Sequence, residues 1–134
     1  MPNSRRSFIA NTVLAGTGFI TSALPLKSMK NEKKIIHHVF FWLKNPSSKE
    51  DQDALVAGLQ TLKKIKSVRE IYIGVPAATE KRSVVDNSYH LSELLFFEDL
   101  EAQKAYQEDP IHQKFVENCA HLWEKVIVYD TLTL

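Results

Sequence analysis

Cysteine and glycine are both scarce in this chain, and each scarcity excludes a class of function. Cys119 is the only cysteine among 134 residues, so the chain cannot form an internal disulfide. We interpret Cys119 as a small buried apolar residue, because no cationic setting for a reactive thiol surrounds it. Outside the first thirty residues, Gly58 and Gly74 stand alone, so no glycine-rich loop is present for a nucleotide. We therefore expect no cofactor.

An excess of charge of one sign is also missing. Lysine and arginine number 17 against 16 aspartate and glutamate residues, which gives a formal net charge of +1. The one basic cluster, Lys63-Lys64-Ile65-Lys66, is typical of a helix that ends in cations. This balance predicts no nucleic-acid partner.

The sequence also has no pair of histidines at the spacing that is typical of metal ligands on a helix. No His-x-x-x-His pattern occurs, and the adjacent His37 and His38 would point to opposite faces of a strand. We expect no metal site. A site assembled from His, Asp and Glu residues distant in the sequence is the alternative.

The first thirty residues have the order of an export signal. Ser4-Arg5-Arg6-Ser7-Phe8-Ile9 precedes an uncharged run from Val13 to Leu24, as in twin-arginine signals. That run is shorter than the roughly 20 apolar residues of a membrane span, so we expect a cleaved signal and a periplasmic protein. An uncleaved N-terminal anchor in the membrane is the alternative, since no clear Ala-x-Ala site follows. Residues 1–30 are thus interpreted as signal and linker, and residues 31–134 as one domain.

The domain alternates between strand-like and helix-like patterns. Their order is strand, helix, strand, strand, broken helix, strand, which predicts an α+β, ferredoxin-like βαββαβ fold with a four-stranded antiparallel sheet. The strands are expected at Ile35–Leu43, Val68–Val75, Tyr89–Phe97 and Lys125–Leu132, with an irregular loop from Pro76 to Ser88.

Helix starts are marked by capping residues. Ser47 and Glu50 form a capping box before a stripe of Leu55, Val56, Leu59 and Leu62 that reaches Ile65. Asp99 caps a short helix through Tyr106, and Asp109-Pro110 starts the next helix, which runs to about Ala120.

The first strand is apolar on both of its faces. Helices can cover one face of the sheet, and leaving the other bare would forgo on the order of 10 kcal/mol at roughly 25 cal/mol per Å². We therefore predict a homodimer in which two sheets pack face to face as a dimeric α/β barrel. A cavity between the sheets would be the natural binding site.

Tyr106 and His112 are the best pair of chemical groups in the chain. On one unbroken helix, residues six apart would point about 240° apart, but the break at Asp109-Pro110 removes that objection. A histidine base and a tyrosine donor suit proton abstraction beside a carbonyl without a metal. The alternative is structural, with His112 bonded to backbone and Tyr106 a core ring whose hydroxyl lies at the rim.

These motifs together resemble the stress-responsive A/B barrel (Dabb) family of the dimeric α/β-barrel superfamily. The resemblance rests on His37-His38-Val39-Phe40-Phe41-Trp42-Leu43-Lys44, Gly74, Phe97-Glu98-Asp99-Leu100, Tyr106-x-x-Asp109-Pro110-x-His112 and Trp123-Glu124-Lys125-Val126. It implies a homodimeric barrel and, for plant members, stress response or cyclisation of a linear polyketide.

The resemblance also implies roles for particular residues. Tyr106 and His112 match the acid–base pair of the plant polyketide cyclase, and His37 matches its first-strand histidine. The histidine of its third strand falls here on Leu91, one residue from His90, and a shift of one residue along a strand is a change of face.

The function expected from the sequence is binding of a small apolar or phenolic molecule in the barrel cavity, in a stress-related role. One alternative is a cofactor-independent enzyme, with polyketide-cyclase-like aldol chemistry or a related lyase or isomerase activity, that uses Tyr106 and His112. A structural assembly protein is another. The candidate ligand-binding residues are His37, His38, Phe40, Trp42, Tyr72, His90 and Leu91.

Overall fold

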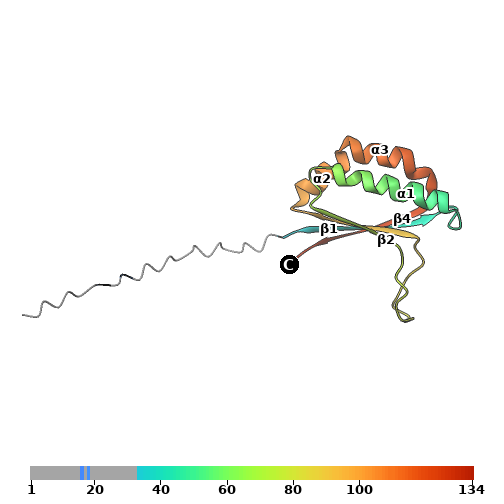
Figure 1. Ribbon diagram of the computed structural model, residues 1–134, viewed down its shortest axis with the longest axis horizontal. Coiled ribbons are helices and arrows are strands. Elements are labelled where there is room, and N and C mark those ends of the chain that lie inside the picture. Colours follow the sequence, from blue (N-terminus) through green and yellow to red (C-terminus); the bar gives the residue numbers. More distant parts are fainter. Residues whose placement is uncertain (1–15, 17, 19–32) are drawn as a thin grey trace, which may run out of the picture.

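The computed structural model describes residues 16, 18 and 33–134, so the expected export signal lies outside the described residues except for Gly16 and Gly18. A four-stranded antiparallel sheet in the order β2-β3-β1-β4 carries the helices on one face (Figure 1). The expected ferredoxin-like α+β fold is confirmed. Its elements are β1 (Ile35–Leu43), α1 (Lys49–Thr61), η1 (Leu62–Lys64), β2 (Glu70–Gly74), β3 (Leu91–Phe97), α2 (Leu100–Glu108), α3 (Pro110–Cys119), η2 (Ala120–Leu122) and β4 (Trp123–Leu132).

Strand β1 occupies the centre of the sheet and has the predicted bounds. Its residues alternate between the two faces, so that His37 is buried beneath the helices and His38 is half-buried on the opposite face. The expectation that these two side chains separate is confirmed. The buried face of β1 consists of Ile35, His37, Val39, Phe41 and Leu43.

The other strands differ from the predicted bounds by a few residues. Strand β2 begins at Glu70 rather than Val68, because the Val68 amide donates to the Ile65 carbonyl at 3.1 Å and closes a turn. Strand β3 begins two residues later than predicted, and β4 two residues earlier. Residues 75–89 form the expected irregular loop, on the side of the sheet away from the helices (Figure 1).

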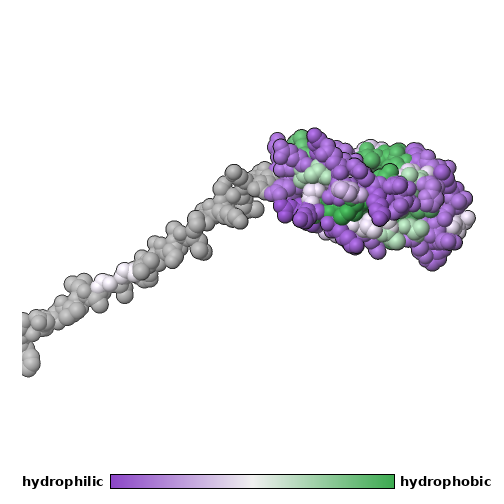
Figure 2. All heavy atoms as spheres, turned by 90° about the horizontal axis from the view of Figure 1, so that it is seen from above, coloured by the Kyte–Doolittle hydropathy of each residue, from purple (hydrophilic) through white to green (hydrophobic). Residues whose placement is uncertain are grey.

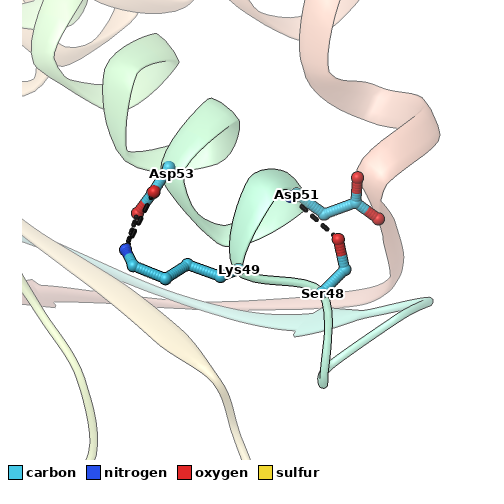
Figure 3. A network of polar contacts seen from close by, with 4 residues as sticks. All are labelled: Ser48, Lys49, Asp51 and Asp53. Atoms are coloured by element: carbon cyan, nitrogen blue, oxygen red, sulfur yellow. Dashed lines mark hydrogen bonds and ion pairs between the residues drawn. The ribbon is translucent and has the colours of Figure 1, made fainter.

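The predicted capping box at Ser47 is wrong by one residue. Ser48 is the N-cap of α1, and its Oγ accepts a hydrogen bond of 3.2 Å from the Asp51 amide (Figure 3). The Ser48 amide itself donates to the Asn45 carbonyl at 3.0 Å, so the preceding turn takes one residue more than the sequence pattern indicates.

Helices α2 and α3 begin where the sequence predicts. The Asp99 carboxylate accepts from the Ala102 amide at 2.7 Å, and the Asp109 carboxylate accepts from the Ile111 amide at 2.8 Å. Pro110 occupies the first turn of α3, where no amide donor is needed. The chain therefore changes direction between Tyr106 and His112.

Helices α1 and α3 approach each other closely at Gly58. A β-carbon at Gly58 would lie 2.5 Å from the Cys119 Sγ and 3.1 Å from the Phe115 ring. Cys119 is buried and free, as expected. Gly58 therefore sets the spacing of these two helices.

The two faces of the molecule differ in polarity. The helix side is largely hydrophilic with hydrophobic patches, as seen from above the sheet (Figure 2). On the open face of the sheet, Tyr72 is 58 % exposed and Tyr129 is 62 % exposed, beside half-buried Phe40 and Trp42. Within residues 33–134, no helix is both long and apolar enough to cross a membrane.

Candidate acid–base site between the sheet and the helices

Tyr106 and His112 lie against each other beneath the helices. Their ring centroids are 4.6 Å apart, although Tyr106 belongs to α2 and His112 to the first turn of α3. Tyr106 is fully buried, whereas His112 is half-buried. The break at Asp109-Pro110 thus brings together the pair that the sequence singled out.

Glu93 of β3 is a member of this cluster that sequence reasoning missed. Its side chain is only 2 % exposed, and its Oε1 lies 3.5 Å from the Tyr106 hydroxyl, which donates to it. Its Oε2 is buried without a hydrogen-bond partner among the described residues. The sequence did hold a signal for it. Every second residue of this strand is apolar and faces the core except Glu93, and a lone acidic residue at such a position favours a functional role over a structural one.

His37 of β1 is the fourth member of the polar cluster that contains Tyr106, His112 and Glu93. Its Nδ1 lies 2.5 Å from the Asp130 Oδ1 of β4, and its ring centroid is 5.7 Å from that of Tyr106. Asp130 is exposed, so it connects the buried imidazole to the molecular surface. A carboxylate on one ring nitrogen of a histidine fixes the orientation of the ring.

Burial shifts the proton affinities of this cluster. Desolvation raises the pKa of Glu93 to about 8, against the smaller opposing effect of the Tyr106 hydrogen bond. The pKa of Tyr106 is raised by burial and by the neighbouring Glu93. The pKa of His112 is lowered, chiefly by burial and further by His37, against the backbone hydrogen bond at Gln107 and the charge of Asp109.

At neutral pH these shifts give His112 an unprotonated ring nitrogen and keep the Tyr106 hydroxyl protonated. Glu93 is largely in its neutral acid form. The cluster therefore combines one base with two hydrogen-bond donors, which suits proton transfer beside a carbonyl group.

The residues predicted to bind a ligand fall on two faces of the sheet. His37 and Leu91 lie on the buried face, whereas His38, Phe40, Trp42 and Tyr72 lie on the open face. His90 precedes β3, and its Nδ1 accepts a hydrogen bond of 2.8 Å from the Leu43 amide. The structure therefore does not bring the seven residues into one site.

Two of the hollows in the described part of the chain are lined by these residues or by their neighbours. One, of about 120 Å³, lies on the open face and is lined by Phe40, Trp42, Asp86, Tyr89, Ile127 and Tyr129. The other, of about 160 Å³, lies between α2 and the edge of the sheet and is lined by Ile35, Leu100, Gln103, Asp130, Thr131 and Leu132. The second hollow is therefore next to the polar cluster only through Asp130, which is bonded to His37.

Metal ligands do not gather in the described part of the chain. No group of three or more His, Cys, Asp or Glu side chains in residues 33–134 is arranged to hold a metal ion.

Residues 35–132 match the family described as the stress responsive A/B barrel domain. A search of curated proteins finds no match. The fold is similar to that of a Dabb-family protein with a ferredoxin-like fold from Mesorhizobium loti, with 25 % identity over 76 % of this chain and 98 % of that one, and a TM-score of 0.63.

Two further solved structures share the fold at lower identity. The hydroxynitrile lyase of Passiflora edulis is 18 % identical over 77 % of this chain and 95 % of its own, with a TM-score of 0.65. A dimeric ferredoxin-like protein of unknown function from Thermobifida fusca is 13 % identical over 77 % of this chain and 93 % of its own, with a TM-score of 0.62.

Proposed function

The chain belongs to the stress-responsive A/B barrel domain family, and from that premise we propose that it is a cofactor-independent enzyme acting on a small carbonyl compound. His112 is the general base and Tyr106 is the hydrogen-bond donor to the carbonyl oxygen. The observation that carries this proposal is the contact of the two rings, tilted by 56° with centroids 4.6 Å apart, at a buried polar cluster.

A purely structural origin of the cluster is disfavoured by its energetics. A buried polar atom without a partner costs about 1–3 kcal/mol, and Glu93 Oε2 is such an atom. A leucine at position 93 would fit the apolar surroundings without that cost. Buried titratable groups with shifted pKa values that lie together are typical of catalytic sites.

The reaction that this geometry supports is proton abstraction from the carbon next to a carbonyl. The unprotonated ring nitrogen of His112 takes the proton, and the electron pair of the C–H bond moves toward the carbonyl. The oxygen, which gains negative charge, accepts a hydrogen bond from Tyr106. Return of the proton from His112 to carbon completes an isomerase-type reaction. In an aldol-type reaction the enolate instead forms a C–C bond to a second carbonyl, and the alkoxide that results takes the proton from His112.

The comparison with the Passiflora edulis protein supports an enzymatic role, because it is a lyase built on the same fold. Access for a substrate is favoured by His112, which is half-buried.

Deuterium exchange at carbon tests this proposal without knowledge of the natural substrate. Acetophenone in D₂O exchanges its methyl hydrogens when a base removes them, and NMR follows the exchange. We expect the protein to accelerate exchange, and His112→Ala to abolish the acceleration while the oligomeric state is unchanged. His121→Ala, at an exposed histidine of η2, is the matched control. Equal acceleration by His112→Ala and the unaltered protein would refute the assignment of the base.

The hollow on the open face supports a second candidate function. Phe40, Trp42, Tyr89 and Tyr129 line it, and such aromatic surfaces bind small apolar or phenolic molecules. Titration with 1-naphthol, followed by tryptophan fluorescence, should show saturable binding that Phe40→Ala weakens. Binding that is unchanged by Phe40→Ala would place the ligand elsewhere.

We also propose that the open face forms the contact of a homodimer. Exposed Tyr72 and Tyr129 beside half-buried Phe40 make an apolar surface that monomers rarely leave bare. Sedimentation should give a dimer for the unaltered protein and a monomer for Phe40→Asp. Masses above the dimer that grow with concentration would favour the structural assembly role instead.

Export through the twin-arginine route is a further proposal, made from Arg5 and Arg6 alone. Replacing both arginines with lysine should keep the protein in the cytoplasmic fraction of cells. Equal recovery of both forms from the periplasm would refute it.

A further inference from the structure

We propose that Glu93 donates a hydrogen bond to the same substrate oxygen as Tyr106, and that the site consequently accepts uncharged carbonyl compounds and rejects carboxylates. The inference rests on the proposed function for the identity of the reacting oxygen. It adds a third residue to the site and a substrate class.

The position of Glu93 makes this role possible. On the buried face of the sheet it is flanked by Val39 of β1 and Ile73 of β2, so both neighbouring strands present apolar side chains to it. One carboxyl oxygen is 3.5 Å from the Tyr106 hydroxyl, and the other has no partner among the described residues. A carbonyl oxygen placed beside Tyr106 would satisfy that buried group.

The 3.5 Å separation is itself informative. It is at the long limit of a hydrogen bond between two oxygens, whose usual distance is about 2.7–2.8 Å. Because the Tyr106 hydroxyl and the Glu93 carboxyl bind each other only weakly, both can still donate to the oxygen of a ligand. A tyrosine hydroxyl beside a carboxylic acid that an apolar site keeps neutral is a known form of oxyanion hole.

The charged and titratable groups around Glu93 exclude an anionic ligand. The Tyr106 hydroxyl of α2 contacts Glu93 directly, and the His112 ring of α3 contacts the Tyr106 ring. His37 lies on the neighbouring strand β1, diagonally opposite Glu93, and its ring is bonded to Asp130 of β4. Every lysine and arginine between residues 33 and 134 is exposed. A carboxylate brought into this cluster would meet the carboxylate of Asp130 and no buried cation, and an unpaired buried charge is strongly unfavourable.

Glu93 can donate only while it holds its proton. Burial raises the pKa of Glu93 to about 8, so the carboxyl is largely protonated at neutral pH and becomes a charged acceptor above that value. The donor is therefore lost in mild alkali, whereas a glutamine at this position would keep an N–H donor at every pH.

A charge-matched pair of ligands tests the substrate class. Methyl 4-acetylbenzoate and 4-acetylbenzoate carry the same ketone, and they differ in one negative charge. Saturation-transfer NMR measures binding, and deuterium exchange of the methyl ketone measures turnover. At pH 7 we expect the ester to bind and to exchange at least tenfold faster than the carboxylate. Equal binding and equal exchange of the two compounds would overturn the proposal.

The pH profile of Glu93→Gln tests the residue. With the ester, exchange by the unaltered protein should fall above about pH 8, and the variant should lose that fall while keeping measurable exchange. The same substitution at exposed Glu117 of α3 is the control and should leave the profile unchanged. An alkaline fall that persists in Glu93→Gln would assign it to another group and overturn the role of Glu93.

The outcomes separate this inference from the proposed function. Selective binding of the ester that weakens above pH 8, without any exchange, would refute the enzymatic function and support the binding role of Glu93. Exchange that depends on His112 but is equal for ester and carboxylate would support the function and refute the inference. The ligand pair needs only the unaltered protein, so it decides the question even if Glu93→Gln does not fold.

Discussion

Replacing Glu93 with glutamine removes an ionisable group from the core and nearly preserves its shape. In the folded protein burial raises the pKa of this carboxyl from 4.5 to about 8, so between these values the folded state holds a proton that the unfolded chain has released. The contribution of Glu93 to the free energy of unfolding is therefore fully present below about pH 4.5. It decreases as the pH rises from there toward about 8. At about 1.4 kcal/mol per pH unit, the decrease reaches about 3 kcal/mol at pH 7.

Chemical denaturation of both proteins between pH 4.5 and 8, at one protein concentration, measures this effect. The difference in unfolding free energy between Glu93→Gln and the unaltered protein cancels groups that both contain. We expect the difference to shift by about 3 kcal/mol in favour of the variant from pH 4.5 to pH 7. Glu117→Gln is the control for loss of a surface carboxylate. A difference that does not change with pH would show that Glu93 ionises as readily in the folded protein as in water.

Three further predictions concern stability. Gly58→Ala should lower the free energy of unfolding by about 2 kcal/mol, because its β-carbon would lie 2.5 Å from Cys119 Sγ. The loss should be smaller in a Cys119→Ala background, which a double-mutant cycle measured by chemical denaturation tests. Ser48→Ala should cost about 1 kcal/mol and Ser47→Ala much less, and equal losses in thermal melts would contradict the assignment of the cap. Asp109→Ala should cost about 1 kcal/mol by the same measurement and should also slow acetophenone exchange, since this cap fixes the start of the helix that carries His112.

Local sequence chemistry determined the helix starts, with one exception. The carboxylates of Asp99 and Asp109 mark their helices because each can accept an amide two or three residues ahead, and that bond needs only nearby atoms. Two adjacent serines precede α1, and either can cap a helix. The hydrogen bond from the Ser48 amide to Asn45 decided between them, and its formation depends on how the turn leaves the sheet.

The pairing of Tyr106 with His112 was predictable because both flank one helix break in a short stretch of chain. The lone acidic residue on the buried side of β3 could have drawn attention to Glu93, but its contact with Tyr106 could not be predicted, since that contact depends on strand β3 lying beneath α2. The separation of His37 from His38 followed from the two-residue period of a strand. Which of them would face the helices did not follow, because both sets of β1 side chains are apolar enough to be covered.

The sequence by itself determined the order of the elements, the ferredoxin-like fold and the residues of the proposed acid–base pair, because periodicity, caps and apolar runs act over a few residues. Only the tertiary structure decided where the buried polar cluster lies. The sequence directed attention to a cavity between two sheets, whereas the buried polar cluster lies between the sheet and its own helices. The reason is physical: a side chain's face, its neighbours and its loss of water are set by elements far apart in the chain, and these alone give Glu93 its proton at neutral pH.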